Sequence, residues 1–85
     1  MTLGQTIREY RSKAGMTQLE LSQKLGYESM QFVHMIEVGR SKCPLKTLGK
    51  LIVILNLPEK KIVSELIANE TKALLKEIKA GKYDN

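Results

Sequence analysis

Residues 17–39 carry two short helix signals, separated by a turn that contains Gly26. Thr17 is followed three residues later by Glu20, which is a capping box at the start of the first helix. Ser29 is the best N-cap for the second helix, which is expected to end at Gly39. Such a pair holds one short helix firmly against its neighbour and leaves an outer face free to contact another molecule.

Three further helical segments are expected, and no stretch alternates as a strand would. They cover about residues 3–14, 45–55 and 59–80, with Pro44 in the first turn of the second and Gly81 as the natural end of the third. The chain is therefore expected to form one all-α domain with a small aliphatic core. The residues expected to face inward are Ile7, Tyr10, Leu21, Ser22, Leu25, Val33, Ile36, Leu48, Leu51, Ile52 and Leu55.

The charge of the chain favours a polyanionic partner. Lys and Arg number 14 against nine Asp and Glu, which gives a net charge of +5. The segment 38–53 contains four of these basic residues and no acidic one. Nucleic acid is the first candidate partner and an anionic membrane the second. No apolar run approaches the roughly 20 residues of a membrane span. A single cysteine, Cys43, cannot form an internal disulfide and indicates a reducing cytoplasm.

Enzymatic chemistry finds little support in the sequence. There is no paired carboxylate in an apolar setting, no glycine-rich phosphate loop and no nucleophile beside a base. His34 stands alone, without other residues at metal-ligand spacing, so neither a metal nor a cofactor is expected. Cys43 lies in a basic loop, which favours a mildly reactive thiolate, but no second cysteine lies near it.

Residues from about Leu3 to Leu66 resemble the Cro and phage-repressor type of helix-turn-helix domain, also called XRE-like. The resemblance is carried, in order, by IREYRSKAGMTQ, LELSQKLG and IEVGRSKCPLKTLGKLIVILNL. It implies an all-α, five-helix, lambda-repressor-like fold over residues 1–66, followed by a C-terminal helical extension over residues 67–85. It also implies that the helix after the glycine turn enters the major groove of double-stranded DNA.

The resemblance assigns roles to individual residues. An arginine late in the first helix pairs with a glutamate late in the third, which places a structural ion pair on Arg11 and Glu37; the alternative is two unrelated surface charges. The phosphate contacts fall on Gln18, Arg40, Ser41, Lys42 and Lys46. The base contacts fall on Ser29, Met30, Gln31, His34 and Met35.

Among the base-contact residues, Gln31 is the strongest reader, because its amide can bond an adenine edge bidentately. Met30 and Met35 offer apolar contacts only, and the alternative is that they contact a partner or the core. The segment between Gly26 and Gly39 holds twelve residues, one more than the usual pattern. If the extra residue lies in the turn, the base-reading register shifts by up to one position and Phe32 also reaches the groove.

The C-terminal extension and the fourth helix carry more apolar residues than a monomer of this size needs. We expect them to form a homodimer interface that places two copies of the recognition helix about 34 Å apart, one turn of DNA. The alternative is that the extension folds back over the core. The expected interface residues are Val53, Ile54, Ile67, Leu74, Leu75 and Ile78.

These features favour a bacterial or phage-encoded transcriptional regulator, more often a repressor than an activator. It would bind a near-palindromic operator as a dimer and lie in the cytoplasm, on the nucleoid when bound to DNA. The alternative is an antitoxin or adaptor of the same fold, which would use the C-terminal extension to bind a partner protein.

Overall fold

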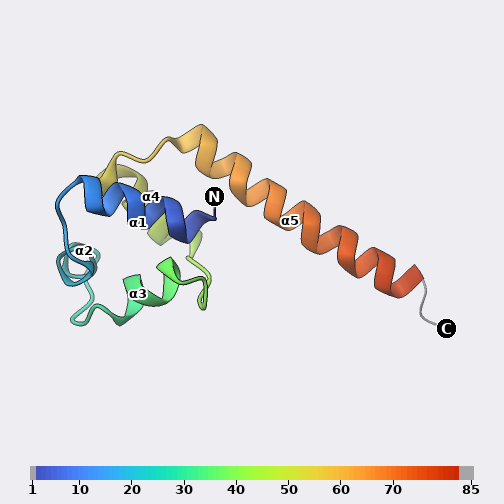
Figure 1. Ribbon diagram of the computed structural model, residues 1–85, viewed down its shortest axis with the longest axis horizontal. Coiled ribbons are helices and arrows are strands. Elements are labelled where there is room, and N and C mark those ends of the chain that lie inside the picture. Colours follow the sequence, from blue (N-terminus) through green and yellow to red (C-terminus); the bar gives the residue numbers. More distant parts are fainter. Residues whose placement is uncertain (1, 83–85) are drawn as a thin grey trace.

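Five helices follow one another in the computed structural model, which describes residues 2–82. The first four pack around a common centre, and α5 leaves them to one side (Figure 1). None of the helices described is long and apolar enough to cross a membrane. The all-α prediction is confirmed. The helices are α1 (Leu3–Lys13), α2 (Gln18–Lys24), α3 (Gln31–Glu37), α4 (Leu45–Leu55) and α5 (Glu59–Lys82).

The ends of the short helices are fixed by local hydrogen bonds. The Thr17 side chain accepts from the Glu20 N–H, and the Glu20 side chain accepts from the Thr17 N–H, so the expected capping box is complete. Gly26 follows α2 with a φ of 93°, a conformation that favours glycine. The Tyr27 N–H then donates to the Ser22 carbonyl at 2.9 Å, which closes the helix end. The turn therefore directs the chain from α2 into α3.

Aliphatic side chains from all five helices and from the loop before α5 form the core. Leu21 and Leu51 lie at its centre, with exposed fractions of 0% and 2%. Gly4 brings the start of α1 against the end of α3, because a Cβ atom there would lie 2.5 Å from the carbonyl oxygens of Ile36 and Glu37. The buried hydrophobic residues are Ile7, Leu21, Leu25, Val33, Ile36, Leu48, Leu51, Leu55, Leu57 and Ile62.

The turn between α2 and α3 differs from the expectation in two ways. Ser29 is not the N-cap, since the cap position is held by Met30, whose carbonyl accepts from the His34 N–H. The Ser29 hydroxyl instead accepts weakly from the Gln31 N–H, two residues ahead, at 3.4 Å. Phe32 does not face outward, because it packs against the core and stacks on Tyr27 with ring centroids 4.1 Å apart.

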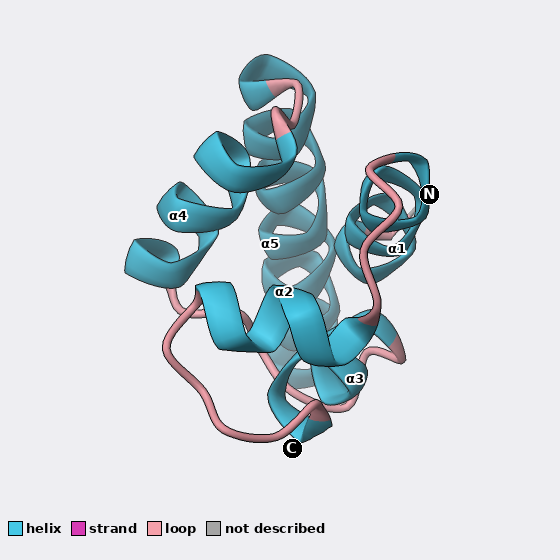
Figure 2. Cartoon of the chain, turned by 90° about the vertical axis from the view of Figure 1, so that its left-hand side faces the viewer, coloured by secondary structure: helices cyan, strands magenta, loops and turns pink. Residues whose placement is uncertain are grey.

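The last helix is continuous from Glu59 to Lys82, so it passes through Gly81, which was expected to end it. Its first turns are held by Ile62, which is fully buried, and Leu66, which is partly buried. From Ile67 onwards every side chain that the structure describes is exposed. The alternative in which this stretch folds back over the core is therefore wrong. Figure 2 shows α4 and α1 on opposite sides of α5 near its start.

Candidate nucleic-acid interface

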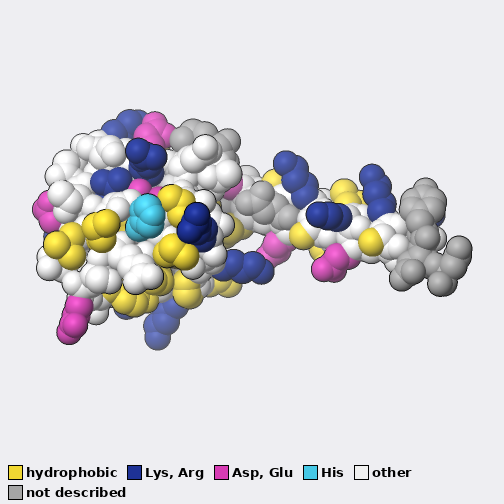
Figure 3. Space-filling view, turned by 60° about the horizontal axis from the view of Figure 1, so that its bottom comes forward, with side chains coloured by type: hydrophobic (Ala, Val, Ile, Leu, Met, Phe, Trp, Pro, Cys, Tyr) yellow, Lys and Arg dark blue, Asp and Glu magenta, His cyan; other side chains and the backbone are white. Residues whose placement is uncertain are grey.

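The outer face of α3 is held outward by buried residues on the opposite side of the helix. Val33 and Ile36 are 2% and 4% exposed and anchor α3 in the core. At helical spacing, this leaves Gln31, His34 and Val38 on the outer side. Figure 3 looks onto this surface, where the histidine lies among hydrophobic side chains with Lys and Arg around them. A short helix fixed in this way can present side chains without paying a large ordering cost on binding.

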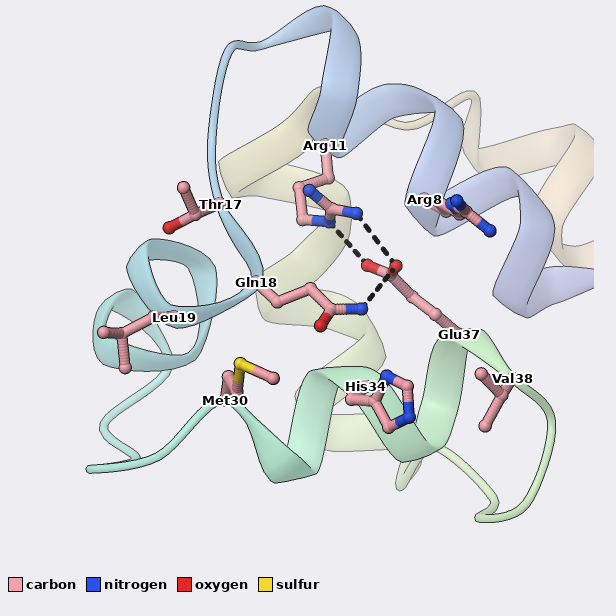
Figure 4. A pocket seen from close by; sticks show the side chains of 9 residues that line it. All are labelled: Arg8, Arg11, Thr17, Gln18, Leu19, Met30, His34, Glu37 and Val38. Carbon is pink, nitrogen blue, oxygen red and sulfur yellow. Dashed lines mark hydrogen bonds and ion pairs between the residues drawn. The ribbon is translucent and has the colours of Figure 1, made fainter.

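An ion pair beneath this face ties three helices together. Arg11 of α1 donates to both carboxylate oxygens of Glu37, from Nε at 2.7 Å and from Nη2 at 3.0 Å. The Gln18 amide of α2 donates to Glu37 Oε1 at 3.1 Å, and Arg11 Nη1 donates to the Met16 carbonyl at 2.8 Å. Figure 4 shows these side chains converging on the carboxylate. The expected Arg11–Glu37 pair is thus a feature of this structure.

The environment of this pair makes it a structural element. The side chains of Arg11 and Glu37 are 13% and 2% exposed. The hydrogen bonds that Arg11 donates to the Glu37 carboxylate raise the pKa of Arg11 above its ordinary value, so the guanidinium stays charged. The Glu37 carboxylate accepts three hydrogen bonds from within the chain, so its acceptor groups are engaged in the scaffold. The pair therefore fixes the angle between α1, α2 and α3.

The basic loop after α3 folds back against the end of that helix. Gly39 has a φ of 79°, and the N–H groups of Arg40 and Ser41 both donate to the Met35 carbonyl, at 2.9 and 3.2 Å. Arg40, Ser41 and Lys42 are exposed, and within residues 2–82 neither basic side chain has an ion-pair partner. The loop thus carries free positive charge directly beside the outer face of α3.

A hollow of about 500 Å³ lies between this outer face, the second half of α1 and the N-terminal end of α2. It contains three of the expected DNA-contacting residues, Gln18, Met30 and His34 (Figure 4). Met30 is 51% exposed at its rim. Both polar and apolar side chains line the hollow.

Four residues that line this hollow were not among the site residues expected from the sequence, namely Arg8, Thr17, Leu19 and Val38. Val38 is 52% exposed and lies four residues after His34, so helical spacing alone would have identified it. Leu19 is 41% exposed and follows Gln18 directly. Arg8 lies on α1, and only the close packing of α1 on α3 at Gly4 brings it here, which no sequence pattern indicates.

The other expected residues lie outside this hollow. Ser29 and Gln31 are exposed at the start of α3, and Met35 is half-buried beside the basic loop. Lys46 lies in a separate groove, on the outer side of α4. Of the expected dimer residues, Ile54 is half-buried and the rest are exposed. The exposed ones are Val53, Ile67, Leu74, Leu75 and Ile78.

Cys43 is less reactive than its basic loop suggested. The thiol is half-buried between α3 and α4, and this burial raises its pKa to about 11. Little thiolate therefore exists near neutral pH, which corrects the expectation of a mildly reactive cysteine. Among residues 2–82, no group of three His, Cys, Asp or Glu side chains lies close enough to hold a metal ion.

Comparison with known proteins bears on this surface directly. Residues 7–62 match the family model described as helix-turn-helix, the Cro and phage-repressor type. The match begins within α1, includes α2, α3 and α4, and ends in the first turn of α5, so it contains the hollow and the basic loop. No curated protein and no solved structure matches the chain significantly.

Proposed function

The chain belongs to the Cro and phage-repressor type of helix-turn-helix proteins, a family of DNA-binding regulators and not of enzymes, and from this we propose its particular mode of action. It acts as a sequence-specific repressor that binds a near-palindromic operator as a homodimer, with α3 in the major groove. The observation that carries the proposal is the outer face of α3, which is anchored from behind and bordered by an acid-free basic loop.

In this proposal Gln31 supplies the directional base contact. Its exposed amide stands in the first turn of α3, where recognition helices of this kind meet base edges. Met30 and Val38 offer apolar contacts, for which the methyl group of thymine is the matching group on DNA. His34 lies between them and adds a polar contact to a base or a phosphate.

Phosphate contacts come from the borders of this face. Arg40 and Lys42 stand on one side, and Arg8 stands across the hollow on α1. The Gln18 amide is held by Glu37 through one hydrogen and keeps its second hydrogen for a phosphate oxygen. These contacts position the protein and make binding sensitive to salt, but they carry little sequence information.

The test is selection of bound sequences from random duplex DNA, with the half-site spacing read from the enriched sequences. We expect two inverted half-sites. Gln31→Ala should relax the preference at one base pair per half-site, at a cost of about 1–3 kcal/mol. The matched variant Lys42→Ala should weaken binding to all sequences and leave the preferred sequence unchanged. If no sequence is enriched, sequence-specific regulation is excluded.

A second candidate function is supported by the exposed apolar residues of α5. Ile67, Leu74 and Ile78 are 58%, 59% and 62% exposed, which suits a helix that binds another protein. In that function the chain is an antitoxin or an adaptor. A purified chain that selects no DNA sequence, yet forms a defined heterocomplex through α5, would favour it over the repressor.

A further inference from the structure

The outer side of α4 forms a groove that has no function in the fold of one chain. Lys46, Gly49, Lys50 and Val53 recur every three or four residues and therefore share one face of the helix. With Lys24 at the end of α2 and Ile54, they line about 550 Å³ of open space. The opposite side of α4, with Leu48, Leu51 and Leu55, is buried in the core.

Two of these residues are unfavourable for a single chain whose α4 surface is exposed to solvent. Val53, in the last turn of α4, is 81% exposed. Gly49 lies in a helix interior, where glycine costs about 0.5–1 kcal/mol relative to alanine. A Cβ atom there would meet nothing within 4 Å, so the packing of this chain does not require a glycine. The missing side chain leaves a notch on the outer surface of α4.

The exposed part of α5 carries a stripe that matches this groove in size and in chemical character. Ile67, Leu74 and Ile78 lie along one side of the helix over about 17 Å. Glu70 and Glu77 lie seven residues apart along one edge of that stripe, and both are exposed. The face of α4 between Lys46 and Val53 spans about 10 Å, which the stripe can cover completely.

The charges of the two surfaces are opposite. Lys24, Lys46 and Lys50 surround the groove, and within residues 2–82 none of them has a carboxylate at ion-pair distance. The α5 of the same chain cannot supply one, because it is a single helix that runs away from α4 (Figure 1). An α5 pairing only with a second α5 would leave Val53 and the lysines uncovered.

We propose that α5 of a second copy of this chain lies in the groove on α4, with its apolar stripe over Gly49 and Val53 and its two glutamates facing the lysines. The arrangement is reciprocal, so each dimer contains two such contacts. This proposal rests on the homodimer of the proposed function and specifies the two surfaces that form the dimer interface. It also assigns Lys46 to the contact between copies.

Charge reversal tests this arrangement in the absence of DNA. Glu70→Lys with Glu77→Lys, and separately Lys46→Glu with Lys50→Glu, should each weaken self-association at least about tenfold, because like charges then face each other. An equimolar mixture of the two double variants should regain dimers, since both contacts are again between opposite charges. Sedimentation velocity measures all three samples.

Gly49→Leu is the second test, since it fills the notch without disturbing the fold of one chain. We expect unchanged helicity by circular dichroism and at least about tenfold weaker self-association. Gly49→Ser is the matched control, because its small side chain should weaken self-association less. Leu74→Asp should weaken self-association in any arrangement that uses the α5 stripe.

The outcomes separate this proposal from the proposed function. If Leu74→Asp weakens the dimer while Gly49→Leu and the lysine reversals do not, α5 pairs with α5 and the groove proposal is overturned, but a dimeric repressor stands. If the unaltered chain stays monomeric, both the groove contact and the dimer are overturned. Loss of sequence selection with an intact dimer overturns the repressor alone.

Discussion

The junction of α1, α2 and α3 differs from the exposed outer faces of α4 and α5, which together we call the α4–α5 surface. The difference is how many polar groups have partners, and how many apolar side chains are buried, within one chain. At the junction, Glu37 receives three hydrogen bonds from Arg11 and Gln18, and the apolar residues around it are buried. On the outer side of α4 and along the end of α5, apolar side chains are exposed, and the lysines there have no ion-pair partner among residues 2–82.

This difference indicates which parts of the molecule have their final structure in the free protein and which parts are available to bind a partner. The junction must be rigid in the free protein, because it fixes the angle at which α3 is presented. The α4–α5 surface contributes little to the stability of one chain, so changes there should affect association and spare folding. Substitutions matched between the two regions make this contrast measurable.

The largest effect on stability is expected at the buried ion pair. Glu37→Ala leaves the mostly buried Arg11 without its partner and should lower the free energy of unfolding by about 3–5 kcal/mol in urea denaturation. Glu9→Ala removes the exposed pair with Lys13 and should leave the free energy of unfolding almost unchanged, because solvent screens this pair. Equal effects of the two variants would show that the junction does not depend on its ion pair.

The next largest difference in stability is expected between alanine substitutions at two helix glycines, Gly4 in α1 and Gly49 in α4. Gly4→Ala should lower the free energy of unfolding by about 1–3 kcal/mol, because its Cβ would press on the backbone at the end of α3. Gly49→Ala should instead raise the free energy of unfolding by up to about 1 kcal/mol, measured at concentrations where the chain is monomeric. Destabilisation by Gly49→Ala would mean that the groove is already packed within one chain.

The smallest effect is expected at a buried hydroxyl group on α2. The Ser22 side chain is fully buried in the contact between α2 and its neighbours, and its oxygen has no hydrogen-bond partner among residues 2–82. Ser22→Ala keeps the small size that the contact needs and removes the unsatisfied group. The free energy of unfolding should rise by about 1 kcal/mol in the same denaturation experiment. A loss of stability would reveal a partner for this hydroxyl.

The sequence predicted most of the fold because the helix ends are encoded locally. Thr17 with Glu20, and the glycines at positions 26 and 39, each act within a few residues of themselves. Ser29 failed as an N-cap because the helix begins one residue later than expected, so that Met30 holds the cap position and the Ser29 hydroxyl accepts only from the Gln31 N–H. A residue type that favours a cap does not by itself determine at which residue the helix begins.

The candidate site could be predicted only in part, because several of its residues meet through tertiary packing. Gln31 and His34 follow from the helical period of α3. Arg8 reaches the same hollow only because α1 packs closely on α3 at Gly4. The sequence also did not predict whether Ile67 and its neighbours on α5 are exposed. An apolar stripe alone does not show whether the core of the same chain covers it.

Sedimentation velocity of the unaltered chain without DNA tests most directly whether a second copy completes the α4–α5 surface. We predict a reversible change from monomer to dimer as the concentration rises through the micromolar range. A sedimentation coefficient that stays at the monomer value throughout would contradict this account, because the exposed residues of α5 and the groove on α4 would then remain uncovered.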